Sequence, residues 1–262
     1  MNSSPIPQSP RSGRRRCRSP SSISTARTCA GPHGDEYQTS TLYLETRTFD
    51  VYQRRGSYGR SKYRIRRYNG SDLAFLERKF RTDRLLAKRR TRFSTDIISR
   101  LANTVGDGRW AGACFHRRIR LRKLHPLVQL SYERMARVSH SSSGPVRLTI
   151  DRHLRALPLP DFAFLPGGVG LPFLDHACIV EVKYQGELPA VFRELAETFC
   201  LDVQKLSKFR AAIRALDYPL GIEPDEQVPH PLAAVLAESD RRGRMQTEDF
   251  RGRVPVPSST TS

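Results

Sequence analysis

Length, composition and charge set broad limits on this protein. It has 262 residues, 38% of them hydrophobic, and a mean hydropathy of −0.53, so one sizeable core and long polar segments are both expected. Lys and Arg number 45 against 26 Asp and Glu, which gives a formal net charge of +19 and a pI near 10.5. Such a charge favours a polyanionic partner, namely nucleic acid, a phosphate polymer or an anionic membrane surface.

The sequence does not predict a membrane-spanning or secreted protein. Its most apolar stretch, Ala156–Leu174, contains Asp161, four prolines and three glycines, which argues against a spanning helix. The arginines near the N-terminus lack the apolar segment of a secretory signal. The five cysteines have no zinc-ligand spacing, so we expect reduced thiols. We therefore expect a cytoplasmic location, with peripheral attachment to a membrane left open.

Composition divides the chain into three parts. Residues 1–36 are rich in Ser, Pro and Arg and predict a disordered arm, because they offer little apolar surface to bury. Residues 221–262 are rich in Pro and end in a Ser/Thr run, which predicts a disordered tail. The ordered domain is expected over residues 37–220.

Strand-like runs dominate this domain, with β-branched and aromatic residues in rough alternation. Asn69-Gly70 predicts a hairpin turn, and Ser139–Gly144 predicts a second link between strands. The expected strands are Thr41–Tyr52, Lys62–Tyr68, Leu73–Phe80, Leu127–Val138, Val146–Asp151 and Cys178–Tyr184.

Three segments predict helices. Arg84–Leu101 has helix-forming composition. A later helix opens at Pro189, and Val191, Leu195 and Phe199 are expected to form its apolar face. The last helix has Ser207 as its N-cap and an apolar stripe made by Phe209, Ile213 and Leu216. The expected fold is a β-rich α+β domain, with antiparallel strands inside and helices packed outside.

Charged residues alternate along several of these strands. Side chains two apart on a strand share a face, so Arg64 and Arg66 point together with Lys62. The same parity pairs Glu77 with Lys79 and Glu181 with Lys183. Arg134 shares the parity of Tyr132, and Arg147 lies opposite its apolar neighbours. Such charges can form the solvated face of a half-buried sheet, or they can line the lumen if the sheet closes into a barrel.

A lumen of this kind suits a polyanion. Arginines grip phosphate oxygens through two hydrogen bonds, and lysines act as point charges. A carboxylate among them is a natural ligand for a divalent cation that bridges phosphate oxygens, and such a site can support in-line phosphoryl transfer. No Walker A motif is present, and Gly167-Gly168-Val169-Gly170 lacks the spacing of a dinucleotide-binding loop.

The ordered set of motifs resembles the VTC domain family of triphosphate tunnel metalloenzymes, also called CYTH-like, from about Tyr37 to Leu216. No single motif is specific, and the resemblance lies in their order. The motifs that carry it are Tyr37-Gln-Thr-Ser-Thr-Leu-Tyr-Leu-Glu-Thr46, Lys62-Tyr-Arg-Ile-Arg-Arg-Tyr68, Phe75-Leu-Glu-Arg-Lys79, the pair Lys88 and Arg89, Tyr132-Glu-Arg134, Val146-Arg-Leu-Thr-Ile-Asp151, Ile179-Val-Glu-Val-Lys-Tyr184 and Lys205-Leu-Ser-Lys-Phe209. The family's opening strand, with an R-x-E-x-K-Y type motif, has no counterpart here, because the Ser/Arg-rich arm occupies its place.

The resemblance implies a tunnel of antiparallel strands that binds ATP or another nucleoside triphosphate together with inorganic polyphosphate. It implies a polyphosphate polymerase, a metal-dependent transferase that passes the terminal phosphoryl group to the chain end. Arg64, Arg66, Lys79 and Glu181 are the implied catalytic residues, and Glu181 would hold Mn²⁺ or Mg²⁺. The implied phosphate-binding residues are Arg64, Arg66, Lys79, Lys88, Arg134, Arg147, Lys183, Lys205, Ser207 and Lys208.

Several roles have two readings. Glu77 is either a second metal ligand or the ion-pair partner of an arginine, and Lys183 either grips phosphate or neutralises Glu181. Ser207 can be a simple helix cap as well as a phosphate ligand near a helix N-terminus. The alternative functions are a tunnel triphosphatase and a non-catalytic polyphosphate-binding module. A membrane-protein partner is compatible with each of these, whereas nucleic acid is not expected to be the specific ligand.

Overall fold

The computed structural model describes residues 25–27, 35–82, 86–103, 109–141, 144–174, 177–201 and 203–218. The expected tail, 221–262, lies outside these ranges, as does the expected arm apart from residues 25–27 and 35–36. Residues 25–27 form a short strand rather than coil.

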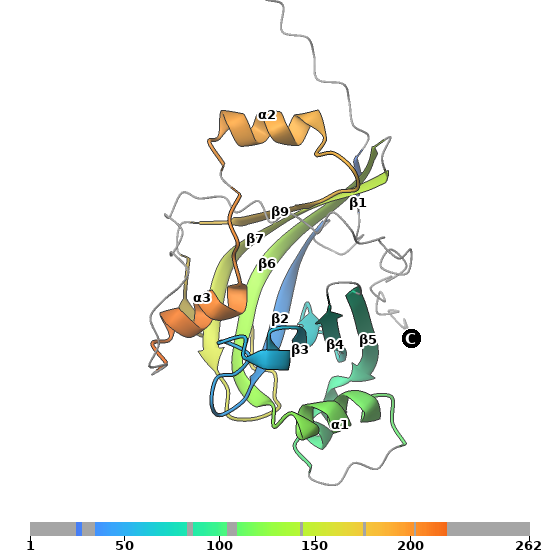
Figure 1. Ribbon diagram of the computed structural model, residues 1–262, viewed down its shortest axis with the longest axis vertical. Coiled ribbons are helices and arrows are strands. Elements are labelled where there is room, and N and C mark those ends of the chain that lie inside the picture. Colours follow the sequence, from blue (N-terminus) through green and yellow to red (C-terminus); the bar gives the residue numbers. More distant parts are fainter. Residues whose placement is uncertain are drawn as a thin grey trace, which may run out of the picture.

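One antiparallel sheet organises the described chain (Figure 1). Its path runs β5-β4-β3-β2-β6-β7-β8, with β1 added to β6 and β9 added to β7. The strands are β1 Thr25–Arg27, β2 Glu36–Glu45, β3 Ser61–Tyr68, β4 Leu73–Arg81, β5 Leu86–Ser94, β6 His125–Ser141, β7 Gly144–Pro158, β8 Leu171–Pro172 and β9 Ile179–Lys183. The helices are the 3-10 turns η1 Gly56–Tyr58 and η2 Thr95–Leu101, and the α-helices α1 Ala113–Leu121, α2 Ala190–Thr198 and α3 Lys208–Ala215.

Hairpin chemistry sets the register of β3 against β4. Asn69 and Gly70 both have positive φ, 46° and 65°, and the Ser71 amide donates to the Tyr68 carbonyl at 2.9 Å. Positive φ at both central residues is what a two-residue type I′ turn requires, and Asn-Gly meets this at low steric cost. The predicted hairpin is confirmed.

The β-rich α+β fold is also confirmed, with every strand pair antiparallel. The long strands β6 and β7 bend, so the sheet curls (Figure 1). Closure into a barrel is not observed, since within the described ranges β5 at one end pairs only with β4 and β9 at the other pairs only with β7.

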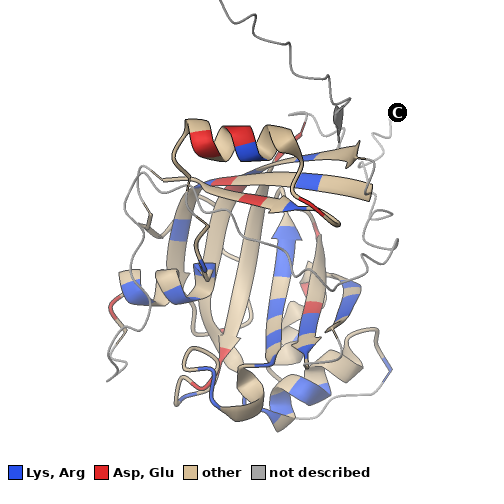
Figure 2. Cartoon of the chain, turned by 45° about the horizontal axis from the view of Figure 1, so that its top comes forward, with Lys and Arg blue, Asp and Glu red and all other residues tan. Residues whose placement is uncertain are grey.

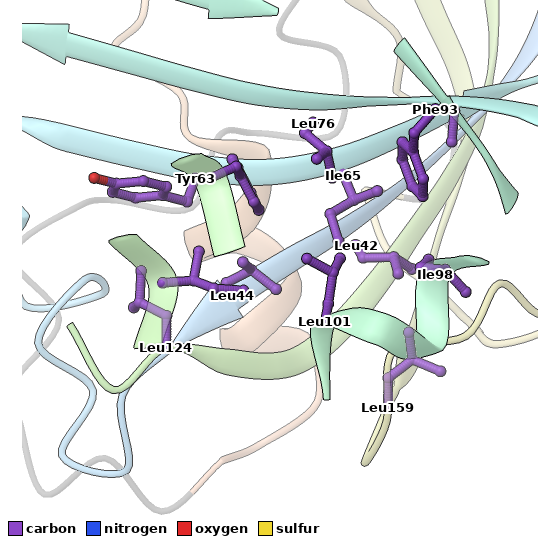
Figure 3. Close-up of a cluster of buried hydrophobic side chains, with 13 residues drawn as sticks. Leu42, Leu44, Tyr63, Ile65, Leu76, Phe93, Ile98, Leu101, Leu124 and Leu159 are labelled. Carbon is purple, nitrogen blue, oxygen red and sulfur yellow. The ribbon is translucent and has the colours of Figure 1, made fainter. Parts of the chain in front are cut away.

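The outer face of the sheet holds the first apolar core (Figure 3). Alternate residues of β2, β3 and β4 point to this side, among them Leu42, Ile65 and Leu76, each at most 1% exposed. The turn η2 and helix α1 cover them, with Leu101 and Ile119 buried beneath. Helix α1 was not predicted, although Phe115 and Ile119 have the i, i+4 spacing of one helix face.

The other two α-helices pack on different faces. Helix α3 lies against the inner face at one end of the sheet, where Phe209 stacks on Tyr43 with 5.2 Å between ring centroids. Helix α2 covers the outer face of β7 and β9. Its predicted apolar face is wrong: Phe192 and Ala196 pack against the sheet, while Leu195 and Phe199 remain 42% and 64% exposed. Both stripes have helical spacing, so only the docking of α2 selects between them.

The predicted helix over Arg84–Leu101 is also wrong. Residues 86–94 form the edge strand β5, and residues 95–101 form η2. Leu, Ala, Lys and Arg favour helix locally, but pairing with β4 over the whole of β5 satisfies the backbone and places Phe93 in the outer core. Tertiary pairing therefore overrides local propensity.

Candidate functional site: a basic face inside a curled sheet

Strand register gathers the predicted side chains on the inner face. Residues directly opposite in an antiparallel pair share a face, so Lys62, Lys79 and Lys88 form one row across β3, β4 and β5. Figure 2 shows the concentration of basic residues on these strands. We call this surface the basic face. Its charged residues are Lys62, Arg64, Arg66, Glu77, Lys79, Arg81, Lys88, Arg90, Arg92, Arg134, Arg147, Asp151, Glu181, Lys183 and, from α3, Lys208.

A buried carboxylate organises the first cluster. The Arg64 Nε donates to Glu77 Oε2 at 2.6 Å, and Arg66 Nη1 lies 3.8 Å from the same oxygen. Arg90 Nε lies 3.3 Å from Oε1. Burial alone would raise the pKa of Glu77, but Arg66, Arg64 and Arg90 lower it to about 2. Both oxygens of Glu77 face arginines. Of the two roles predicted for Glu77, metal ligand or ion-pair partner of an arginine, the geometry therefore favours the ion pair.

Arg90 is a site residue that sequence reasoning missed. Its guanidinium lies 3.6 Å from the centroid of the Phe75 ring, and Nη2 donates to the Tyr68 hydroxyl at 3.1 Å. With Glu77 on its third side, this guanidinium is held in one orientation while its side chain stays 33% exposed. Its strand parity could have revealed it, but the segment was assigned to a helix.

A second carboxylate, Asp151, joins the sheet to α3. Arg134 donates to Asp151 through Nε and Nη2, at 2.6 and 2.8 Å, and Lys208 Nζ lies 2.8 Å from Oδ2. Asp151 is 1% exposed; its burial raises its pKa, but Arg134 and Lys208 lower it below its usual range. This bridge places the N-terminus of α3 beside β6 and β7.

Ser207 is the N-cap of α3, as predicted, because its hydroxyl accepts from the Arg210 amide at 3.5 Å. Lys205 is exposed two residues earlier. Lys208 is the first helical residue, and its ammonium also lies 5.6 Å from the centroid of the Tyr132 ring. Basic residues therefore accompany the positive end of the helix dipole.

Glu181 and Lys183 lie side by side on β9, with Nζ 3.3 Å from Oε1. Burial acts to raise the pKa of Glu181, but the charges of Lys183, Lys208 and Arg134 lower it. Glu181 thus lies within electrostatic range of both β6 and α3. For Lys183, burial and the charges of Arg147 and Lys88 lower the pKa, and Glu181 opposes them.

Lys79 has no hydrogen-bond or ion-pair partner within the described ranges. The Lys79 side chain is exposed, but its partial desolvation against the curled sheet lowers its pKa, and the charges of Lys183, Lys62 and Arg64 lower the pKa further. Because Lys183 lies in β9 and Lys79 in β4, the curl of the sheet brings its two ends within range of each other. The basic face therefore carries repulsion between cations that its own carboxylates do not neutralise.

The VTC domain family model matches residues 11–217. This chain belongs to the VTC domain family. The match extends N-terminal to Tyr37, into the segment for which we expected an arm.

Other comparisons add little to the assignment of this VTC domain. Eleven chains of solved structures match it; one is the crystal structure of a "putative adenylate cyclase" from Bacillus halodurans, with 16% identity, a TM-score of 0.40, and coverage of 69% of this chain and 84% of that chain. That degree of likeness carries no inference about function. No curated protein matched. None of the described helices has the length and apolarity needed to cross a membrane.

The donor set of this VTC domain limits how a metal ion could bind. Among the described residues, no group of three or more His, Cys, Asp and Glu side chains is placed to hold one. Glu77 and Asp151 are almost fully buried and each faces at least two basic side chains. Glu181 is paired with Lys183 alone and its side chain is 26% exposed, so it is the most accessible of these three carboxylates. One carboxylate fits Mn²⁺ or Mg²⁺ only where phosphate oxygens and water complete the shell, which is how Mg²⁺ commonly binds beside phosphates.

Proposed function

We propose that the basic face binds a nucleoside triphosphate and inorganic polyphosphate, and that the domain transfers the terminal phosphoryl group to the chain end. The observation that supports this is the excess of cations on the basic face. Beyond the effect of desolvation, the charge of Lys183 lowers the pKa of Lys79, and the charges of Arg147 and Lys88 lower the pKa of Lys183. Such an arrangement is costly in the free protein and is relieved by a polyanion.

In this proposal, two kinds of arginine have different tasks. Arg64 has its guanidinium fixed against Glu77, yet 32% of its side chain is exposed, so it can bind phosphate without losing much rotamer freedom. Arg66 is 8% exposed and donates from Nε to the Thr41 hydroxyl at 3.1 Å. It adds charge from beneath the surface and positions its neighbours.

Lysines and α3 would hold the rest of the ligand. Lys79, Lys88, Arg147 and Lys183 would neutralise phosphates from two sides of the curled sheet. Arg134 is held by Asp151 beside the start of α3, where Lys205, Ser207 and Lys208 would bind an anion near backbone amides. Glu181 would supply one ligand to Mn²⁺ or Mg²⁺, which when bound neutralises charge on phosphate oxygens.

Phosphoryl transfer asks mainly for positioning and charge stabilisation. A terminal oxygen of the acceptor chain attacks the γ-phosphorus, the bond from that phosphorus to the bridging oxygen breaks, and a nucleoside diphosphate leaves. Basic residues from β3, β4, β7 and β9 would hold donor and acceptor in line and stabilise the charge shared by the transferring group.

A second candidate is a non-catalytic polyphosphate-binding module. It is favoured by the engagement of all three carboxylates with basic side chains, Glu77 and Asp151 with arginines and Glu181 with Lys183, so that a metal would have to compete with Lys183 for Glu181. Within the described ranges the sheet is not closed by hydrogen bonds between its two ends, an arrangement compatible with binding of a preformed chain.

Incubation of the purified full chain with ATP, Mn²⁺ and a short polyphosphate primer, followed by gel analysis, separates these functions. The polymerase predicts longer chains and released ADP, both dependent on metal. Orthophosphate without longer chains would indicate a triphosphatase. Retention of polyphosphate with no turnover would indicate the binding module.

A further inference from the structure

Basic side chains continue from the basic face around the edge of the sheet formed by β5. Strand β5 is an edge strand within the described part of the sheet, and it carries basic side chains on both sides. Lys88 and Arg90 point to the basic face, whereas Arg89 pairs across the sheet with Arg78 on the outer face. Successive strand residues are about 3.3 Å apart and point in opposite directions, so a flexible anion can cross this edge without leaving cationic surroundings.

Helix α1 continues this surface beyond β5. Phe115 of α1 and Phe93 of β5 belong to the same buried cluster, which fixes the helix beneath the outer side of the strand. The pKa of the Cys114 thiol is lowered by a hydrogen bond with Arg118 and, in addition, by the charges of Arg89 and Arg117. Arg89 of β5 and Arg117 of α1 therefore both lie within electrostatic range of the Cys114 thiol, which places them on one continuous surface.

The exposed side of α1 is strongly basic, and the helix contains no acidic residue. Arg117 and Arg120 are exposed in α1, and Lys123 is exposed just beyond it. No Asp or Glu occurs in the sequence from Arg109 to Tyr132. Within the part of the chain that the structure describes, Arg117, Arg120 and Lys123 form no ion pair with an acidic side chain.

We propose that β5 and α1 form an exterior track for the distal part of a long polyphosphate chain whose end lies on the basic face. This rests on the proposed function and extends it, because it assigns long chains an additional set of contacts. Arg89, Arg117 and Arg120 are its central residues. Because α1 packs on the outer side of the sheet, opposite the basic face, we expect a triphosphate bound on the basic face not to contact Arg117 and Arg120.

An anionic membrane and a nucleic acid are less well matched by the same surface. Leu121, 77% exposed, is the one large apolar side chain exposed on α1, which offers little insertion into a bilayer. Of the aromatic residues near α1, Tyr63 and Phe115 are buried in the outer core. Trp110 and Tyr58 are half-buried and already engaged, with the Trp110 ring against His116 and the Tyr58 ring beneath the Arg122 guanidinium, so the surface offers no row of free rings on which bases could stack.

The test compares Arg117→Glu/Arg120→Glu with a matched control, Arg137→Glu/Arg193→Glu, in the full chain. Both pairs reverse two positive charges, and α2, which carries Arg193, lies at the end of the molecule opposite α1 (Figure 1). Affinity for tripolyphosphate and for long-chain polyphosphate is measured at several salt concentrations. For long chains, the α1 variant is expected to bind about tenfold more weakly, with the salt slope reduced by roughly 1.5 for two lost contacts. Tripolyphosphate affinity changes less than about twofold, as expected for a screened distant charge.

Three results would overturn the track: unchanged long-chain affinity, an equal loss for both ligands, or an equal loss in the control variant. Loss of binding to anionic vesicles or to RNA, with polyphosphate affinity intact, would assign the surface to that partner instead. If the unmodified protein binds neither tripolyphosphate nor long chains, the proposed function itself fails, which is a distinct outcome.

Discussion

Lys79 of β4 lies within electrostatic range of Lys183 of β9, although β3, β2, β6 and β7 separate the two strands in the sheet. Cations so placed repel one another, and burial adds to the penalty of keeping them charged. A polyanion bound between these cations would offset their repulsion, because each lysine would gain an attraction to the bound negative charge. The relationship therefore links the curl of the sheet directly to the proposed ligand.

Replacing Lys79 should have opposite effects on stability and binding. A lysine whose pKa is lowered in the folded state destabilises the fold while it is protonated, so Lys79→Gln is expected to raise the Tm of the free protein at neutral pH. Polyphosphate affinity should fall roughly tenfold through loss of one charge-assisted contact. Thermal melts with and without polyphosphate measure both effects, and a lower Tm in the free variant would contradict the repulsion.

Glu77 should make stability depend on acid pH. Its folded pKa is about 2, below the ordinary value near 4.5, so its stabilisation is fully present above about pH 4.5 and is lost as pH falls towards 2. Glu77→Gln is expected to lose about 3–5 kcal/mol, because three arginines lose a buried partner. Urea unfolding across this pH range measures it, with the exposed Glu133→Gln as control.

Glu181 should affect turnover more than folding. If it supplies a metal ligand, Glu181→Gln should lower kcat about 100-fold or more, by loss of charge stabilisation at the transferring group. Glu187→Gln, an exposed residue just beyond β9, serves as the matched control. Equal Mn²⁺-dependent turnover in both variants, with circular dichroism unchanged, would falsify the metal role of Glu181.

Arg64 and Arg66 should separate binding from stability. Arg64→Ala removes a partly exposed guanidinium and is expected to weaken polyphosphate binding roughly tenfold, with a small change in Tm. Arg66→Ala removes a buried partner of Glu77 and Thr41, so it should cost about 3 kcal/mol of stability as well. Titration calorimetry and melting curves distinguish them, and similar Tm losses for both would contradict the assigned roles.

Much of the site followed from strand parity. Within each strand, alternation puts Arg64 with Arg66, Glu77 with Lys79, and Glu181 with Lys183 on one face. That the faces of different strands coincide depends on the pairing register, and the Asn69-Gly70 turn pins that register for β3 and β4 alone. The roles of these residues in phosphate or metal binding stay predictions. Arg90 was missed because its segment has the local composition of a helix, and only pairing with Leu73–Arg81 makes it a strand.

By itself, the sequence determined the antiparallel β-rich class, the face on which most charged strand residues lie and the cap of α3 at Ser207. These are local properties, governed by periodicity and turn or capping chemistry. Only the tertiary structure decided which stripe of α2 is buried, that β5 is a strand, and that β9 returns within range of β4. These depend on contacts between residues far apart in the chain, whose free energies outweigh local preference and have no local signature.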